Sequence, residues 1–261
     1  MRDESRQPVR ISKYFTDCGV MSRRAAEAAI ERGEVRVNGA PAELGQKILP
    51  GQDTVTWRGK PVRLPVQADK VCIMLNKPRG YVTTLSDDRG RHTVAELVAD
   101  AGVRLYPIGR LDMDSDGLLL LTNDGSFANG IMHPSRHISK TYRVTVRPDV
   151  TEEQLIALSG SMELDGKMTQ PATVVVKTKE PGRVVLLMTI HEGKNRQIRR
   201  MCESVGLEVA RLRRISIGPL KLGMLKPGTY RDLTAEELRA IRNAMGTGET
   251  AAPAKNKGRR R

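Results

Sequence analysis

The most constraining feature of this sequence is a run of four leucines, Leu118–Leu121, that directly follows a loop rich in aspartate. The run stands between turn signals, Gly117 before it and an Asn-Asp-Gly triplet at 123–125 after it. Such a short, bounded apolar run predicts a strand that is buried on both faces. The preceding loop, residues 109–117, therefore presents three carboxylates at the end of a rigid element, where catalytic and binding residues are often placed.

Two interpretations without catalysis compete for this acidic loop. Asp112, Asp114, Asp116 and Gly117 match the first half of a calcium-binding loop, in which alternate oxygens converge on a hard cation. The twelfth position needs a bidentate glutamate but is Asn123, so the sequence disfavours calcium and we expect no metal. The other interpretation, that the aspartates are only solvated loop acids, stays open from the loop alone, because clustered surface aspartates are common.

The overall charge of the chain points to a polyanionic partner. Its 261 residues include 44 lysines and arginines against 30 acids, which gives a formal net charge of +14. Nucleic acid is the commonest partner of such a protein. One tryptophan, five tyrosines and two phenylalanines are too few for a broad base-stacking platform. Three cysteines far apart and the lack of an apolar run of 18 residues predict a cytoplasmic protein without a membrane span.

The first 64 residues predict a small separate domain of two helices and a sheet. Ser22 is a suitable N-cap for a helix over 23–32, and strands at 35–37 and 54–57 follow, the first ending in an Asn-Gly turn. The arrangement over 9–64 resembles the S4 RNA-binding domain, whose second helix turns a basic face to RNA phosphates. That resemblance implies RNA binding by Arg23 and Arg24. The alternative is that these arginines form a merely solvated face.

Two further stretches stand out beyond an expected linker at 65–70. Residues 141–147 alternate between apolar and polar, which places Tyr142 on the inward face of a strand. On periodicity alone, Tyr142 is better explained as a core tyrosine than as a catalytic one. Residues 193–206 predict a helix with Asn195 as N-cap and Gly206 at its end. Three arginines lie outside the apolar stripe of that helix: Arg196, Arg199 and Arg200.

Four motifs in order, at 77–81, 109–121, 140–142 and 195–201, resemble those of pseudouridine synthases. The resemblance is closest to the ribosomal RNA group with a leading S4 domain, the RsuA family, and it covers about residues 9–243. It implies an α+β fold, in which the S4 domain precedes a mixed α/β catalytic domain over 71–245. An extended, largely antiparallel sheet with a central cleft is expected there. A basic, disordered tail is expected over 246–261.

The same resemblance implies roles for individual residues. Asp112 is expected to be the catalytic carboxylate, Tyr142 to pack against the target base, and Arg199 to pair with Asp112. Arg110 is expected to hold the base in its flipped-out position. Asp114 and Asp116 are expected to shape the loop or repel phosphates without a catalytic role. The basic motif residues expected to bind RNA are Lys77, Arg110, Arg196 and Arg200.

The function implied is site-specific isomerisation of uridine to pseudouridine in ribosomal RNA. We prefer the 23S RNA of the large subunit, and 16S RNA is the alternative within the class. A catalytically silent RNA-binding or ribosome-assembly factor is the rival from another class. No group enters or leaves the nucleoside, so no cofactor is expected. The expected partner is ribosomal RNA or an assembly intermediate, bound by a monomer.

Overall fold

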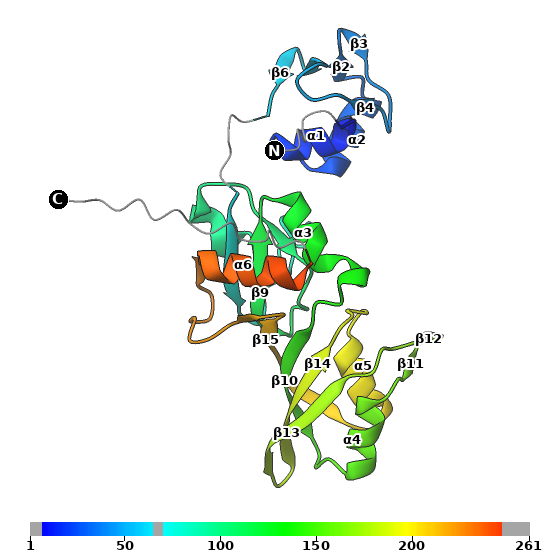
Figure 1. Ribbon diagram of the computed structural model, residues 1–261, viewed down its shortest axis with the longest axis vertical. Helices are drawn as coiled ribbons and strands as arrows, with labels where there is room; N and C mark the ends of the chain where they lie inside the picture. Colours follow the sequence, from blue (N-terminus) through cyan, green and yellow to red (C-terminus); the bar gives the residue numbers. More distant parts are fainter. Residues whose placement is uncertain (1–6, 65–69, 247–261) are drawn as a thin grey trace, which may run out of the picture. The chain divides into compact units, whose positions relative to one another are not determined.

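The computed structural model of the chain describes residues 7–64 and 70–246. The chain divides between Lys70 and Val71 into two compact units (Figure 1). Of the predicted linker, 65–70, only Lys70 is described, and of the predicted tail, 246–261, only Gly246. Both of these predictions otherwise lie outside the described residues. None of the helices in the described ranges has the length and apolarity that a membrane crossing requires.

The N-terminal unit packs two helices, α1 (Ile11–Asp17) and α2 (Arg23–Glu31), with short strands. Ser22 caps α2 as predicted, because its side chain accepts a hydrogen bond from the backbone N–H of Ala25. Its four-stranded sheet has the order β3-β2-β5-β6, and β1 pairs with β4. The strands are β1 (Val9–Arg10), β2 (Val35–Val37), β3 (Ala40–Pro41), β4 (Lys47–Ile48), β5 (Val55–Trp57) and β6 (Lys60–Val62).

The C-terminal unit is built on one nine-stranded sheet with the order β13-β14-β10-β15-β9-β7-β17, to which β16 and β8 are added beside β15 and β9. All its pairings are antiparallel except β15 with β9, which confirms the predicted, largely antiparallel sheet. The strands are β7 (Cys72–Lys77), β8 (Tyr106–Ile108), β9 (Asp116–Thr122), β10 (Lys140–Arg147), β13 (Thr173–Glu180), β14 (Arg183–Ile190), β15 (Glu208–Ile217), β16 (Leu220–Lys221) and β17 (Tyr230–Asp232). A separate small hairpin joins β11 (Glu163–Leu164) and β12 (Lys167–Met168).

The leucine run lies in β9, and the prediction that it is buried on both faces is confirmed. Every residue of β9 is buried. Leu119 and Leu121 belong to one hydrophobic core, and Leu118 and Leu120 belong to a second core on the other face. Because successive side chains of a strand point to opposite faces, four apolar residues in a row serve both cores at once.

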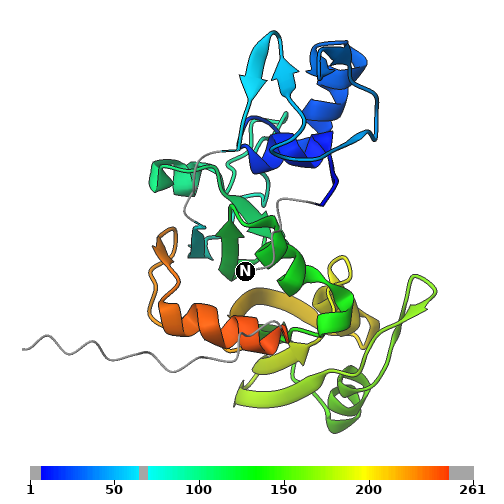
Figure 2. The ribbon, with the colours of Figure 1, turned by 45° about the horizontal axis from the view of Figure 1, so that its top comes forward.

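Helices cover different parts of the sheet. Figure 1 shows α4 (Glu152–Ser159) and α5 (Gln197–Ser204) beside the part of the sheet that contains β13, β14 and β10. Near β9, Figures 1 and 2 show α3 (Gly125–Met132) and α6 (Ala235–Ala244) close together. Their contact is tight, because a Cβ on Gly130 of α3 would lie 2.6 Å from the sulfur of Met245.

One local prediction differs from the structure. The predicted N-cap of α5 was one residue early: Arg196, with φ +47°, occupies the cap position in place of Asn195. The apolar pattern before β8 forms a 3-10 helix, η2 (Glu96–Ala101), in which Val98 leaves helical geometry. A further 3-10 turn, η3 (Pro134–Arg136), follows α3 because Pro134 cannot continue an α-helix.

Candidate active site

The acidic loop leads from β8 into β9, and its position is set by a very close approach of two strands. Gly117 and Arg214 are neighbours on the parallel strands β9 and β15. A Cβ on Gly117 would lie 2.2 Å from the backbone oxygen of Arg214, and the φ angle of Gly117 is +111°. Only glycine fits at this position, because a side chain would meet main-chain atoms.

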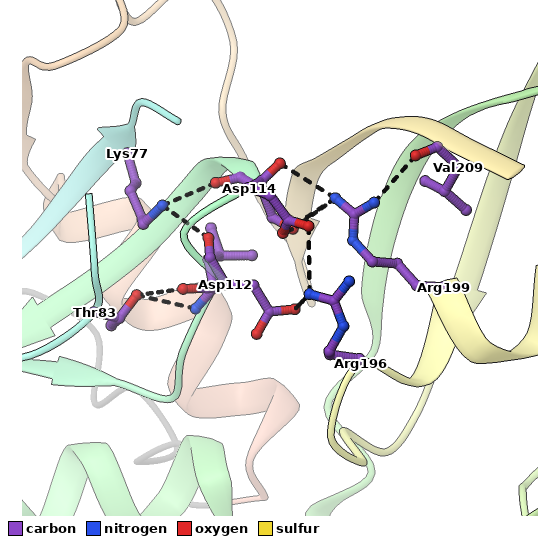
Figure 3. A network of polar contacts seen from close by, with 9 residues as sticks. Lys77, Thr83, Asp112, Asp114, Arg196, Arg199 and Val209 are labelled. Carbon is purple, nitrogen blue, oxygen red and sulfur yellow. Dashed lines mark hydrogen bonds and ion pairs between the residues drawn. The ribbon is translucent and has the colours of Figure 1, made fainter. Parts of the chain in front are cut away.

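Lys77, at the end of β7, holds the main chain of the loop (Figure 3). Its side chain is fully buried, and Nζ donates hydrogen bonds to the backbone oxygens of Pro78 at 3.1 Å, Asp112 at 3.0 Å and Ser115 at 2.9 Å. The hydroxyl of Thr83 donates to the Leu111 oxygen at 2.6 Å and accepts from the Leu111 N–H at 3.2 Å. Hydrogen bonds thus hold the peptide groups on both sides of Asp112.

Two arginines hold further carbonyls of the same segment. Arg199 donates to the backbone oxygens of Asp114 at 3.2 Å and Val209 at 3.1 Å. Arg214 donates to the backbone oxygen of Leu118 at 2.7 Å and to that of Arg110 at 3.4 Å. Three buried or nearly buried cations therefore fix the loop before any ligand binds, which is the preorganisation that a catalytic side chain needs.

The sequence-based prediction that Lys77 binds RNA is wrong. Its ammonium group is enclosed and donates to three carbonyls, so it is not available to a phosphate. Burial lowers the pKa of Lys77 to about 8, although Asp116, Asp112 and Asp114 favour its charged form. Lys77 is therefore a structural cation beneath the loop.

The predicted pairing of Arg199 with Asp112 is also wrong. The guanidinium of Arg199 lies 3.2 Å from the carboxylate of Asp114 (Figure 3). Arg196 is the arginine beside Asp112, at 3.7 Å, and it also lies 3.3 Å from Asp114. Burial raises the pKa of Asp114, but Arg199 and Arg196 together outweigh burial and hold that pKa below its ordinary value. Arg199 can therefore affect Asp112 only by holding the backbone of the loop in position.

The three aspartates have separate partners. Asp116 is buried and lies 2.9 Å from Arg211 and 3.6 Å from Arg213, both on β15. Its carboxylate therefore ties the start of β9 to β15 and takes no part in a shared site with Asp112. Across residues 7–64 and 70–246, no three His, Cys, Asp or Glu side chains gather in a way that could hold a metal ion.

A pocket of about 490 Å³ opens beside Asp112. Tyr142 and Arg214, which are neighbours on β10 and β15, lie in its wall. Tyr142 is buried and also lines the pocket, so its inward position is compatible with both interpretations of the sequence. Arg214 donates to the Tyr142 hydroxyl at 3.4 Å, and its guanidinium carbon lies 6.0 Å from the centre of the ring. Arg110 is exposed at the same pocket.

Sequence reasoning missed the importance of two pocket residues. Arg214 was given no role, although its position two residues after Leu212 on an alternating strand indicates an inward side chain. Lys140 was part of a motif without a role, yet it lines the pocket. Among the other predicted RNA-binding residues, Arg200 pairs with Asp165, and Arg23 and Arg24 are exposed at the start of α2.

We expect Lys77→Met to destabilise the fold by about 2–4 kcal/mol, because it leaves three carbonyls without their donor. The exposed Lys179→Met serves as control and should change the free energy of unfolding little. Urea unfolding measures both.

The stability contributed by Lys77 should also depend on pH. Between pH 8 and 10.5 the unfolded chain keeps a proton on Lys77 that the folded chain has lost. The wild type should therefore gain stability relative to Lys77→Met as the pH rises through this range. A pH-independent difference would contradict the burial of a charged Lys77.

Comparison with known proteins gives consistent matches over almost the whole chain. The family model for RNA pseudouridylate synthase matches residues 71–204. A ribosomal large subunit pseudouridine synthase B of Bacillus subtilis is 40% identical over 245 residues, which are 93% of this chain and 99% of that protein. A dual-specificity RNA pseudouridine synthase of Escherichia coli is 38% identical over 253 residues, 95% of this chain and 85% of that protein. A crystal structure of a pseudouridylate synthase has a TM-score of 0.65 at 30% identity and covers 89% of this chain and 99% of its own.

Proposed function

This chain belongs to the RNA pseudouridylate synthase family, and on that premise we propose that it converts one specific uridine of large-subunit ribosomal RNA to pseudouridine. Isomerisation of uridine in RNA is the activity of the family. The choice of ribosomal RNA rests on the relatives, of which one at 40% identity is named for the large subunit. The observation that supports the catalytic assignment best is the loop held by Lys77, Arg199 and Arg214, which fixes Asp112 at the mouth of a pocket.

The reaction explains why a carboxylate belongs at this position. The bond between N1 and C1′ of uridine must break, the base must turn, and C5 must bond to C1′. Asp112 can serve as a nucleophile toward the sugar or the base, or it can take a proton from the sugar. The guanidinium of Arg196 lies 3.7 Å from the Asp112 carboxylate and helps to hold it at the pocket.

The target base must leave its stack to reach Asp112, as in other enzymes that modify bases. In the proposed complex the uracil packs against the ring of Tyr142, which forms a flat wall of the pocket. Arg110 is exposed beside the pocket and is suited to support the RNA from which the base has turned out. Arg196, the residue before α5, adds positive charge at the pocket, whereas Arg200 on α5 is paired with Asp165.

We assign the N-terminal unit the role of an S4 RNA-binding domain. Arg23 and Arg24 are exposed on the first turn of α2, and no ion pair with an acid in the described residues engages either of them. Cations that are free in this way can replace the counterions of a phosphate backbone.

The double variant Arg23→Gln/Arg24→Gln should weaken RNA binding and reduce the slope of log K against log salt concentration by about 1.5–2. Single-turnover isomerisation at saturating protein should be unchanged, because the pocket lies in the other unit. Filter binding at several salt concentrations measures the slope. Lys177→Gln, an exposed cation on β13, is the control and should leave both quantities as in the wild type. An unchanged slope in the double variant would refute the S4 assignment.

The substrate proposal is tested with purified protein and separate large- and small-subunit RNAs from cells that lack the gene. We expect one new pseudouridine in the large-subunit RNA and none in the small-subunit RNA. Conversion of the small-subunit RNA alone would contradict the choice of substrate. A protein that binds either RNA without converting it would contradict the enzymatic function.

A further inference from the structure

Two cations in the wall of the active-site pocket have no acidic partner among the residues that the structure describes. Lys140 starts β10, and Arg214 lies on the neighbouring strand β15. Nζ of Lys140 donates to the backbone oxygen of Ile138 at 3.0 Å, which leaves two of its three N–H groups free. Arg214 is only 3% exposed, and its Nη2 has no hydrogen-bond acceptor in the described part of the chain. Within the described parts of the chain, no carboxylate lies at ion-pair distance from either side chain.

A buried and a half-buried cation so close together, with no counter-charge in the described ranges, are electrostatically unfavourable. Burial lowers the pKa of Lys140, and the positive charge of Arg214 lowers it further. Removing cations from water without a counter-charge costs free energy that the fold must recover elsewhere. Uncompensated charge of this kind is useful where negative charge appears on a ligand, because the stabilising groups are then already in place.

The proposed reaction, on which this inference rests, produces such a charge. When the N1–C1′ bond breaks, its electron pair leaves with N1, and the detached uracil is an anion whose charge is shared by N1, O2 and O4. C1′ then forms a bond to the Asp112 carboxylate, or the sugar loses a proton and C1′ becomes part of a double bond. After C5 bonds to C1′, the C5 proton is released and N1 takes one up. The negative charge therefore exists only while the base is detached.

We propose that Lys140, supported by Arg214, stabilises the detached uracil anion. Lys140 and Tyr142 are two residues apart on one face of β10, roughly 7 Å along the strand. A base packed on the Tyr142 ring lies within reach of the Lys140 ammonium group. Arg214 adds its charge beside the Tyr142 ring, 6.0 Å from the ring centre, and it also holds the Arg110 and Leu118 carbonyls. Lys140 is the group placed to contact the base, and Arg214 is a positioning residue.

Other charged groups at the pocket do not already supply this interaction. Glu192 accepts hydrogen bonds from Gln170 and Gln197 and lies 3.9 Å from Lys194. Arg196 is beside Asp112 and Asp114, and Arg110 is exposed. His133 and His191 also line the pocket, where His133 bonds to Ser135 and His191 to the His137 oxygen.

The test compares Lys140→Met and Lys140→Arg in single-turnover reactions on ribosomal RNA from cells that lack the gene. We expect Lys140→Met to lower the rate at saturating protein by about 10²–10³-fold, with the RNA Kd within twofold of wild type. Lys140→Arg should keep the rate within about tenfold, because the charge is retained. Lys221→Met, an exposed lysine on β16, is the control and should match the wild type.

A pH series separates a charge effect from a structural one. The wild-type rate should fall as the pH rises through the lowered pKa of Lys140, whereas arginine stays charged. The ratio of the Lys140→Arg rate to the wild-type rate should therefore rise with pH, since titrations common to both proteins cancel. If Lys140→Met does not fold, this rate ratio still tests whether the charge of Lys140 contributes to the reaction.

Three results would overturn the proposal. The first is a Lys140→Met rate equal to the wild-type rate. The second is a weaker Kd and a smaller salt slope with an unchanged rate, which would make Lys140 a phosphate contact. The third is a rate ratio that does not change with pH. A wild-type protein that is inactive on this RNA would refute the proposed substrate instead, so the two failures are distinguishable.

Discussion

Asp112→Asn should abolish isomerisation, with a single-turnover rate at least about 10³-fold below that of the wild type. The amide keeps the shape of the side chain but can act neither as a nucleophile nor as a base. The Asp112 side chain is about one-third exposed, and its only ion pair within residues 7–64 and 70–246 is the 3.7 Å contact with Arg196. We therefore expect the free energy of unfolding to change by about 0.5 kcal/mol or less and the RNA Kd to stay near that of the wild type.

Asp88→Asn provides the matched control for this substitution. Asp88 is exposed in the loop before η2 and is likewise an aspartate in the catalytic unit. It should retain the full rate, which shows that loss of one negative charge from a protein of net charge +14 is not the cause. Residual activity of Asp112→Asn within tenfold of wild type would mean that another group performs the chemistry.

Gly117→Ala should be the most destabilising single substitution of those discussed, with a cost of about 3–5 kcal/mol. The added Cβ would lie 2.2 Å from the oxygen and 2.8 Å from the nitrogen of Arg214, which are main-chain atoms of the neighbouring strand. The strands β9 and β15 can accommodate it only by separating. Urea unfolding followed by circular dichroism measures the loss. The rate of any folded fraction should fall too, because Arg214 would no longer hold the loop.

Gly182→Ala separates the steric effect from the backbone effect. Gly182 also has a positive φ, +69°, but an added Cβ would have no atom within 4 Å. It should cost only about 1–2 kcal/mol, the ordinary penalty for a side chain in the left-handed region. Equal destabilisation by the two alanines would show that the contact of Gly117 with Arg214 does not limit the packing of β9 on β15.

The strand that carries the acidic loop could be predicted because its signal is local. Four consecutive leucines between turn residues require apolar surroundings on both sides, and β9 contributes to two cores. The cap of α2 by Ser22 is likewise a matter of a few neighbouring residues. The order of the strands, in contrast, depends on contacts between residues that are far apart in the sequence. The parallel contact of β9 with β15 joins residues almost 100 positions apart, and no periodicity indicates it.

The errors at the site have one physical origin. A motif places basic residues near an aspartate but does not say which oxygen each cation meets. Lys77 was assigned to RNA and Arg199 to the Asp112 carboxylate, whereas both donate to backbone carbonyls of the loop. Backbone acceptors are present at every residue and leave no mark in the sequence. Only the folded geometry shows that these cations hold the loop, and that Lys140 and Arg214 have no acidic partner in the described ranges, 7–64 and 70–246.

In the proposed function, Asp112 catalyses the isomerisation of a uridine in large-subunit ribosomal RNA. Pseudouridine mapping in cells that lack the gene, complemented with either the wild type or Asp112→Asn, tests it most directly. We predict that one pseudouridine disappears from the large-subunit RNA, that the wild type restores it, and that Asp112→Asn does not. An unchanged pseudouridine map in the cells without the gene would contradict this function, and restoration by Asp112→Asn would contradict the role of Asp112.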